Sequence, residues 1–479
     1  MQRATKLVGG WLLAWCCCLN HCWGQSESVA IEVEPRLTHL RNAEPREWSS
    51  FPERAEASKL EKKFQATTNA REVTLRIRQQ DVKQLWRVLL NEKPLGELQR
   101  DEADIVWFLP IPHGALRDGE NVLLIEAKGS AKPAADDIRV GELRIEPRPV
   151  KEVLSSAHCE IEVLERDTDT HTPARITIVA KSGGLQQTSA ISNNELAVRP
   201  GVIYTASGRA RFSLPAGDYV VYAGRGFEYS LAKVELKASA GETVRRMLEI
   251  RREVATPGFV ACDTHVHTFT HSGHGDATIE ERMITLAGEG IELPIATDHN
   301  KHIDYRPTAT KLGVDKYFTP IMGNEVTTSV GHFNVFPVAD GARVPNHQLK
   351  EWNAIFPEIF ATPGVRVCIL NHARDIHSNT RPFGPDLFNA TIGENFAGWP
   401  MQFNAMEVIN SGATRSETLG LLHDWMAVLN RGYQVTPVGS SDSHDVSRYI
   451  VGQGRTYIRC DDSDVSKLDT ETAVKNFLE

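Results

Sequence analysis

The feature that most constrains this chain is a histidine-rich loop that follows a short apolar run, within residues 258–276. The run itself, residues 259–262, is typical of a buried strand. His265 and His267 follow it two residues apart, so at the period of a strand both imidazoles point to the same side. Two histidines at a strand end can reach one ion, which indicates a metal site more strongly than a lone histidine does. The alternative interpretation is a pair of ordinary polar loop residues.

From about residue 257 onward, short apolar runs alternate with segments of helical length. The helix-like segments are 277–287, 349–360 and 415–430. This alternation is typical of β/α units around a mostly parallel sheet. Nearly every apolar run ends in a group that can bind a metal or a polar substrate. Because active sites of β/α barrels collect at the C-terminal ends of the strands, we expect these groups to meet in one site.

The groups at the strand ends are mostly imidazoles, and 12 of the 17 histidines lie between His265 and His444. Imidazole combined with carboxylate suits zinc, manganese or iron, and the set contains no thiolate that would demand zinc. A water held between two such cations loses its proton near neutral pH and becomes a nucleophile. The predicted chemistry is therefore hydrolysis by a metal-bridged hydroxide, without a Ser-His-Asp triad.

The order of the motifs resembles that of the PHP (polymerase and histidinol phosphatase) metallohydrolases. The sequence contains HxH, then TDH, then a Glu with GH a few residues later, then NH, then DxH, within about 257–460. The multidomain setting is similar to the CehA/McbA-type branch. The resemblance implies a distorted (β/α)7-type barrel, two or three divalent metal ions (Zn, Mn or Fe) and phosphoesterase activity. The branch is also associated with carbamate hydrolysis.

The resemblance also implies a set of metal ligands at the strand ends. They are His265, His267, His274, His299, Glu325, His332, His372, Asp442 and His444. Glu325 would bridge two metals, and His299 and His444 would share a third metal with a histidine of the first loop. For that last position the resemblance favours His274, with His271 as the alternative.

Further residues near these motifs are candidates for other roles. Asp276 and Asp298 are expected to orient ligands rather than to bind metal. Glu325 and Asp442 would act in catalysis as metal ligands. Arg374 is a candidate for neutralising an anionic substrate group, and His377 for protonating the leaving group. Ordinary loop residues are the alternative for both.

The first half of the chain is predicted to hold two β modules. Alternating runs separated by turn residues cover 28–150 and 152–254, with a proline-containing boundary between them. The first resembles galactose-binding-type jelly rolls and the second carboxypeptidase-regulatory-like sandwiches. The predicted fold class is thus multidomain, with two all-β sandwiches followed by an α/β barrel over 257–479. Whether that last domain is complete at its C-terminus is left open.

Residues 1–24 have the layout of a signal peptide, with basic residues before an apolar run too short to span a bilayer. We therefore expect an exported protein, periplasmic or extracellular, without a transmembrane segment. The net charge of −9 disfavours nucleic acid as a partner. The expected substrate is a small-molecule or glycan-linked ester. Two alternatives stay open: a carbamate, ester or amide hydrolase on the same metal site, and a glycan-binding protein whose barrel is not catalytic.

Overall fold

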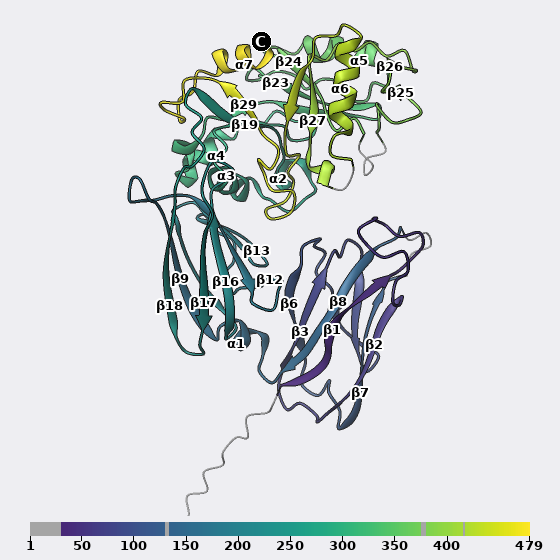
Figure 1. Cartoon of the computed structure of the whole chain (residues 1–479), viewed down its shortest axis with the longest axis vertical. Coiled ribbons are helices and arrows are strands. Elements are labelled where there is room, and N and C mark those ends of the chain that lie inside the picture. Colours follow the sequence, from purple (N-terminus) through teal and green to yellow (C-terminus); the bar gives the residue numbers. More distant parts are fainter. Residues whose placement is uncertain (1–29, 130–133, 375–379, 415–416) are drawn as a thin grey trace, which may run out of the picture.

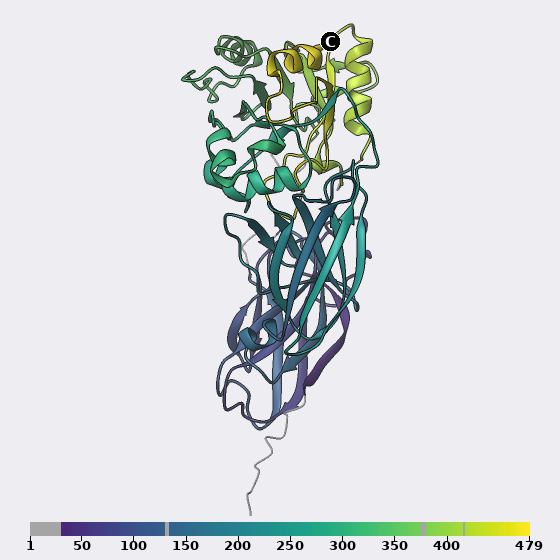
Figure 2. The same cartoon turned by 90° about the vertical axis from the view of Figure 1, so that its left-hand side faces the viewer.

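The computed structural model describes residues 30–129, 134–374, 380–414 and 417–479. The predicted signal peptide and His377 lie outside these ranges. Figures 1 and 2 show two β-rich units in the lower part of the molecule and a C-terminal unit of strands and helices above them. We call these the first β unit (31–146), the second β unit (150–250) and the C-terminal unit (259–478).

The first β unit packs two antiparallel layers face to face. Along β3 and β4 buried and more exposed residues alternate, which places the apolar side chains on the inner face. Leu75, Trp86 and Val140 are fully buried in the resulting core. One layer has the order β1-β8-β3-β6 and the other β2-β7-β4-β5. The strands are β1 (Ile31–Arg41), β2 (Lys59–Ala66), β3 (Val73–Gln80), β4 (Trp86–Leu90), β5 (Lys93–Glu97), β6 (Ile105–Ile111), β7 (Gly119–Ala127) and β8 (Asp137–Glu146).

The second β unit follows the short helix α1 (Val150–Leu154) and also has two layers. β12 runs parallel to β6, with Leu185 opposite Ile105, so one ten-stranded sheet continues from the first β unit into the second. The smaller layer is β10-β9-β15 with β18 beside β9. The strands are β9 (Ala157–Glu165), β10 (Thr170–His171), β11 (Ala174–Ala180), β12 (Leu185–Gln186), β13 (Leu196–Arg199), β14 (Val202–Thr205), β15 (Arg209–Leu214), β16 (Gly217–Gly224), β17 (Ala232–Ala238) and β18 (Thr243–Ile250).

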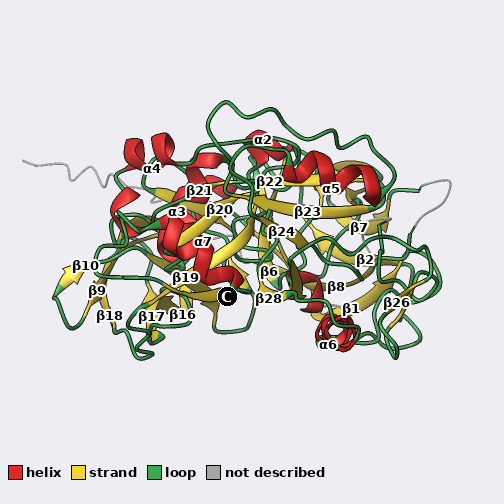
Figure 3. Cartoon of the chain, turned by 90° about the horizontal axis from the view of Figure 1, so that it is seen from above, coloured by secondary structure: helices red, strands yellow, loops and turns green. Residues whose placement is uncertain are grey.

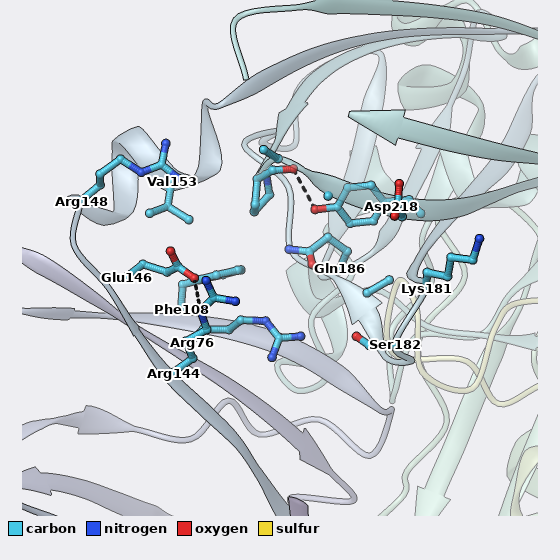
Figure 4. A pocket seen from close by; sticks show the side chains of 15 residues that line it. Arg76, Phe108, Arg144, Glu146, Arg148, Val153, Lys181, Ser182, Gln186 and Asp218 are labelled. Carbon is cyan, nitrogen blue, oxygen red and sulfur yellow. Dashed lines mark hydrogen bonds and ion pairs between the residues drawn. The ribbon is translucent and has the colours of Figure 1, made fainter. Parts of the chain in front are cut away.

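A cavity of about 500 Å³ lies between the two β units and is rich in arginine (Figure 4). These arginines have partners within the protein. Arg144 Nε lies 2.9 Å from Glu146 Oε1, and Arg148 Nη1 donates to Ser156 Oγ at 3.0 Å. Arg76 Nη1 lies 3.4 Å from Glu142 Oε2. Two of these pairs lie within the first β unit and the third ties the linker to Ser156, and no predicted metal ligand lines the cavity.

The C-terminal unit contains two main sheets and a two-stranded sheet, β25-β26, with the helices around them (Figure 3). The four-stranded sheet has the order β21-β20-β19-β29, and the five-stranded sheet β22-β23-β24-β27-β28. The strands are β19 (Phe259–Val266), β20 (Leu293–Ala296), β21 (Ile321–Met322), β22 (Asn324–Thr328), β23 (Gly331–Phe336), β24 (Val367–Leu370), β25 (Phe388–Asn389), β26 (Glu394–Asn395), β27 (Ala405–Ile409), β28 (Thr436–Gly439) and β29 (Thr456–Arg459). The helices are α2 (Phe269–Ser272), α3 (Ile279–Gly288), α4 (Arg306–Leu312), α5 (Trp352–Phe360), α6 (Gly420–Asn430) and α7 (Thr470–Leu478), with 3-10 turns at Asp315–Tyr317 and Ser411–Thr414.

The predicted fold class is wrong. The described chain is mostly β, and its C-terminal unit has two main sheets and a small two-stranded one instead of a continuous (β/α)7-type barrel. β22 and β23 form a hairpin because only two residues separate them, too few for the crossover that a parallel pair needs. β23–β24 and β19–β29 are antiparallel as well. Strand–helix alternation suggested a parallel barrel because it did not reveal which neighbours pair directly.

The C-terminal unit is docked on the second β unit through helix α3. Thr278 caps this helix, and Glu281 completes a capping box by accepting from the Thr278 backbone. Ile284 of α3 packs against Tyr204 and Val202 of β14 in a shared apolar cluster. Tyr204 also donates a 2.6 Å hydrogen bond to Glu289 at the end of the helix. Within the described ranges, no helix has the length and apolar character needed to cross a membrane.

Candidate metal centre

The candidate site lies at the seam between the two sheets of the C-terminal unit. Single bridges join the sheets there, Val266 with Ser443 and His299 with Glu325. β19 ends at this seam, with His265 near its end and His267 directly after it, and both are fully buried. The fold therefore brings residues about 180 positions apart in the sequence into one cluster, as the strand-end pattern predicted.

Glu325 is the central carboxylate of the cluster. It is fully buried on β22, and His299 Nδ1 contacts its Oε2. Four further imidazoles approach it: His332 Nδ1 at 3.2 Å, His265 Nε2 at 3.4 Å, His372 Nε2 at 3.4 Å and His267 Nε2 at 3.7 Å. The first three of these face Oε1, whereas His267 faces Oε2. Glu325 thus faces His265, His332 and His372 with one oxygen and His267 and His299 with the other.

Asp442 supplies a second carboxylate that faces the same two histidine nitrogens. Its Oδ1 lies 3.2 Å from His265 Nε2 and 3.3 Å from His267 Nε2. Its Oδ2 lies 3.9 Å from His372 Nε2. Asp442 and His372 both have positive φ, +52° and +23°. Non-glycine residues rarely adopt this conformation, and strain of this kind concentrates at functional sites.

The remaining predicted ligands form a histidine-rich subsite, which we define as His274, His299 and His444. His299 Nε2 lies 3.3 Å from His274 Nε2 and 3.3 Å from His444 Nε2. His267 stacks on His444, with ring centroids 4.0 Å apart, and so connects this subsite to the carboxylates. The structure therefore places the imidazole of His274 with the other two. The backbone carbonyl of His271, the alternative, accepts from Lys301 Nζ at 2.6 Å.

The ring nitrogens that converge on the site fit a cation. His265 Nε2, His267 Nε2 and His332 Nδ1 are buried and have no hydrogen-bond partner. Leaving a buried polar atom without a partner costs free energy, so such atoms need an explanation. The ligand atoms of His265, Glu325 and His372 all lie within 4.8 Å of one another, as do those of His265, His267 and Asp442. Imidazole and carboxylate at this spacing suit zinc, manganese or iron.

Hydrogen bonds behind the histidines fix which nitrogen is free. Glu407 Oε1 accepts from His265 Nδ1 at 2.6 Å, so in the neutral form of the ring Nε2 is the lone-pair atom that faces the site. Glu407 Oε2 also accepts from the backbone N–H of His372 at 2.6 Å. Ser272 Oγ donates to Asp298 at 2.7 Å, so it accepts from His267 Nδ1 at 3.2 Å. Both histidines of the first pair are thus oriented with Nε2 inward.

Two aspartates, Asp298 and Asp263, also support the cluster, and the sequence predicted such a role only for Asp298. Asp298 accepts from Thr268, Ser272 and Tyr305, which agrees with an orienting role. Asp263 was not predicted, although it lies within the first motif. It is fully buried and accepts from the backbone of His265, Ser441 and Gly452, and so ties β19 to the loop that carries Asp442.

Electrostatics divide the cluster into two parts. Burial lowers the pKa of His265, but Asp442, Glu407 and Glu325 outweigh it and raise this pKa well above its usual value. Burial raises the pKa of Glu325, but the surrounding histidines bring it well below its usual range. For His267 and His444, burial lowers the pKa and neighbouring imidazoles lower it further. The imidazoles favoured in the neutral form are thus His267 and His444, whereas Glu325 outweighs burial at His299 and raises its pKa.

The predicted anion-binding residue Arg374 is engaged away from the ligands. Its Nη2 donates to Asp424 Oδ1 of α6 at 2.8 Å, and its Nε contacts the other carboxylate oxygen. His377, the predicted acid, lies outside the described residues. The structure thus brings all nine predicted ligands together but gives Arg374 a structural partner.

Comparisons with known proteins do not assign the chain to a family. No family model matches the chain, and no curated protein matches it. Among solved structures, it is similar to the minor pilin GBS52 of Streptococcus agalactiae (15% identity, 46% of this chain and 98% of that chain, TM-score 0.19). It is also similar to the 5-hydroxyisourate hydrolase of Klebsiella pneumoniae (14% identity, 20% and 90%, TM-score 0.15) and to BcpA, the major pilin subunit of Bacillus cereus (12% identity, 46% and 71%, TM-score 0.16). At such TM-scores these likenesses do not define the fold.

Proposed function

We propose that this chain is an exported metal-dependent hydrolase whose active site is the histidine and carboxylate cluster of the C-terminal unit. One observation carries the proposal. Three buried imidazole nitrogens, on His265, His267 and His332, have no hydrogen-bond partner and face two carboxylates. A divalent cation would satisfy these nitrogens and the carboxylate charge together. Export rests on the signal-peptide pattern of residues 1–24.

The residues divide into clear roles in this proposal. His265, His267 and Asp442 would hold one cation, and His332 and His372 a second, with Glu325 between the two. His274, His299 and His444 would hold a third. Bound cations would supply Lewis acidity and an activated water for hydrolysis. Glu407 and Ser272 would keep the first histidine pair in the tautomer that leaves Nε2 free for a cation.

The bond that is cleaved follows from the motif resemblance to PHP metallohydrolases, which favours a phosphoester. A carbamate, carboxylic ester or amide would use the same ligands, so the substrate class needs a direct comparison. The substrate would be a small molecule or an ester linked to a glycan. Arg374, held by Asp424, is not assigned a role in binding it.

The decisive experiment measures metal content together with activity. Protein purified without a metal-affinity tag is expected to contain two or three equivalents of zinc, manganese or iron per chain. The His265→Ala/His267→Ala variant should lose metal and activity on a panel of phosphomonoesters, phosphodiesters, carbamates and carboxylic esters. The matched control is His158→Ala/His171→Ala in the second β unit, which should retain both. Less than about one equivalent, unchanged in the first variant and not restored by added zinc or manganese, would refute a metallohydrolase.

A folded, metal-loaded protein that cleaves nothing on the panel would instead favour a binding function for the β units. The panel also separates the two hydrolase alternatives, because phosphoesters and carbamates are assayed with the same metal-loaded preparation. If the cluster is the active site, removing metal with EDTA should abolish the activity, and adding the metal back should restore it.

A further inference from the structure

A single arginine of the second β unit reaches into the histidine-rich loop of the C-terminal unit. Arg199 is the last residue of β13. Its Nε donates to Asp276 Oδ2 at 2.8 Å, and its Nη2 donates to Asp276 Oδ1 at 3.0 Å and to the Asp276 carbonyl at 2.7 Å. This is the two-pronged geometry that guanidinium groups form with carboxylates. Asp276 follows His274 by two residues, so the arginine holds the loop that carries this imidazole.

The same guanidinium is anchored on helix α3. Arg199 Nη1 lies 2.8 Å from Glu281 Oε1, and Ser192 Oγ of the second β unit donates to the same oxygen at 2.6 Å. Glu281 is also the capping-box residue of α3. The Arg199 side chain is only 19% exposed and that of Glu281 only 8%. This ion pair is therefore largely shielded from solvent, where charge-assisted bonds hold geometry better than exposed pairs do.

Asp276 also forms hydrogen bonds with the loop that carries His444. Its Oδ1 accepts from the backbone N–H of Val446 at 2.8 Å, and its own N–H donates to the His444 carbonyl at 3.2 Å. Asp276, two residues beyond His274, thus joins the opposite loop both at His444 itself and two residues beyond it. His274 Nε2 and His444 Nε2 each lie near His299 Nε2, the third member of the subsite.

We propose that Arg199 is a positioning residue for the histidine-rich subsite, which the second β unit completes by fixing the loops of His274 and His444 through Asp276. This rests on the proposed metal function of the cluster. The carboxylate part of the cluster has its own supports, Glu407 and Asp263, inside the C-terminal unit. The β unit therefore controls one metal position and leaves the others unaffected.

The test compares metal binding by full-length wild type, Arg199→Gln and Asp276→Asn, with zinc as the probe. Both variants should weaken binding at one position by about 10–100-fold, the usual effect of losing an outer-shell partner, and lose about one equivalent on dialysis. The matched control is Arg175→Gln. Arg175 also lies on the second β unit and also contacts an α3 carboxylate, with Nε 3.2 Å from Glu289 Oε1, but it does not contact Asp276. It should retain every equivalent.

A double variant locates the effect. If Arg199 acts through the histidine-rich subsite, Arg199→Gln/His274→Ala should lose no more zinc than His274→Ala alone, because coupled residues are not additive. Additive losses would overturn the proposal, and so would full metal content in Arg199→Gln. Arg199→Lys, which keeps the charge but not the fork, should show an intermediate loss.

The outcomes distinguish this inference from the proposed function. If wild type binds no metal, both fail. If wild type binds two or three equivalents and Arg199→Gln matches Arg175→Gln, only the positioning role fails. If Arg199→Gln and the milder Asp276→Asn both fail to fold while Arg175→Gln folds, the ion pair is a general folding contact and the positioning role is rejected.

Discussion

Glu407 Oε1 lies 2.6 Å from His265 Nδ1, while the other ring nitrogen of His265 faces Asp442 at 3.2 Å and Glu325 at 3.4 Å. One buried carboxylate thus accepts a hydrogen bond from the outer side of the ring, and two carboxylates lie on its inner side. Glu407 comes from β27 and His265 from β19, in different sheets. The orientation of His265, a candidate ligand, therefore depends on how the two sheets lie relative to each other.

Glu407→Gln should weaken metal binding while preserving the fold. The amide has nearly the same volume but lacks the charge that holds the His265 tautomer, so we expect about 10–100-fold weaker binding of zinc in competition with a chelator. The control is Glu228→Gln, which changes another buried carboxylate, one that pairs with Arg455 away from the histidines. Equal affinities in the two variants would contradict a supporting role for Glu407.

Removing metal should destabilise the C-terminal unit selectively. A ligand at about 100 times its Kd stabilises the folded state by about 2.7 kcal/mol, which corresponds to a Tm shift of about 5–10 °C in a unit of this size. Differential scanning calorimetry should therefore show a lower Tm for one unfolding transition with EDTA than after zinc addition. The His265→Ala/His267→Ala variant serves as the control and should show a much smaller shift. An identical shift in both proteins would mean that zinc stabilises the chain elsewhere.

Gly275→Ala should damage the histidine-rich subsite. A Cβ at this position would lie 2.5 Å from the His444 carbonyl oxygen and 2.6 Å from the His444 Cβ, so the loop that carries His444 must move. Gly273→Ala is the matched control because Gly273 has a similar φ, +82° against +79°, but nothing lies within 4 Å of its added Cβ. Both variants should lose about 1–2 kcal/mol from the left-handed backbone.

Metal analysis separates the two glycine variants. Only Gly275→Ala should lose about one equivalent of zinc, and its affinity at the remaining positions should match that of Gly273→Ala. Equal zinc content in the two proteins would show that the loop can shift without disturbing His444.

That these residues would lie close together was predictable because the order of their motifs resembles that of a metallohydrolase family, and their role as metal ligands stays a prediction. The nine predicted ligands meet in one cluster, and the short spacing of His265 and His267 at the end of β19 explains why the first pair was the clearest signal. Arg374 illustrates the limit. A basic residue next to a ligand motif suggests anion binding, but its partner Asp424 lies 50 positions away on α6, and no local pattern reveals such a pair.

The fold was harder to predict than the site. Apolar runs marked where strands lie but did not determine their pairing, and the β22–β23 hairpin and the β19–β29 pair replace the parallel neighbours that a barrel requires. The contact from Arg199 to Asp276 was equally hidden, because it joins a β unit to a loop 77 positions further along. Long-range pairing depends on the whole folded chain, whereas a ligand motif is local.

The Arg199–Glu281 pair should make stability depend on pH in a defined direction. Burial raises the pKa of Glu281, but the hydrogen bonds and charge of Arg199 outweigh it, so the pKa in the folded state is lower than usual. A carboxyl group whose pKa is lowered by folding stabilises the protein above its unfolded pKa, about 4.3 for Glu, and this contribution disappears as pH falls through the folded value. The free energy lost in Arg199→Gln should therefore be largest above about pH 5 and shrink below about pH 4.

Urea unfolding between pH 3.5 and 7, with EDTA present to remove any linkage to metal, measures this difference. Glu281→Gln provides the control because it lacks the titrating carboxyl. In that background the effect of Arg199→Gln should vary much less with pH. A loss that stays constant from pH 7 to pH 3.5 in the wild-type background would mean that Arg199 stabilises the protein through packing or through its neutral contacts, such as the one with the Asp276 carbonyl, and not through the charge of Glu281.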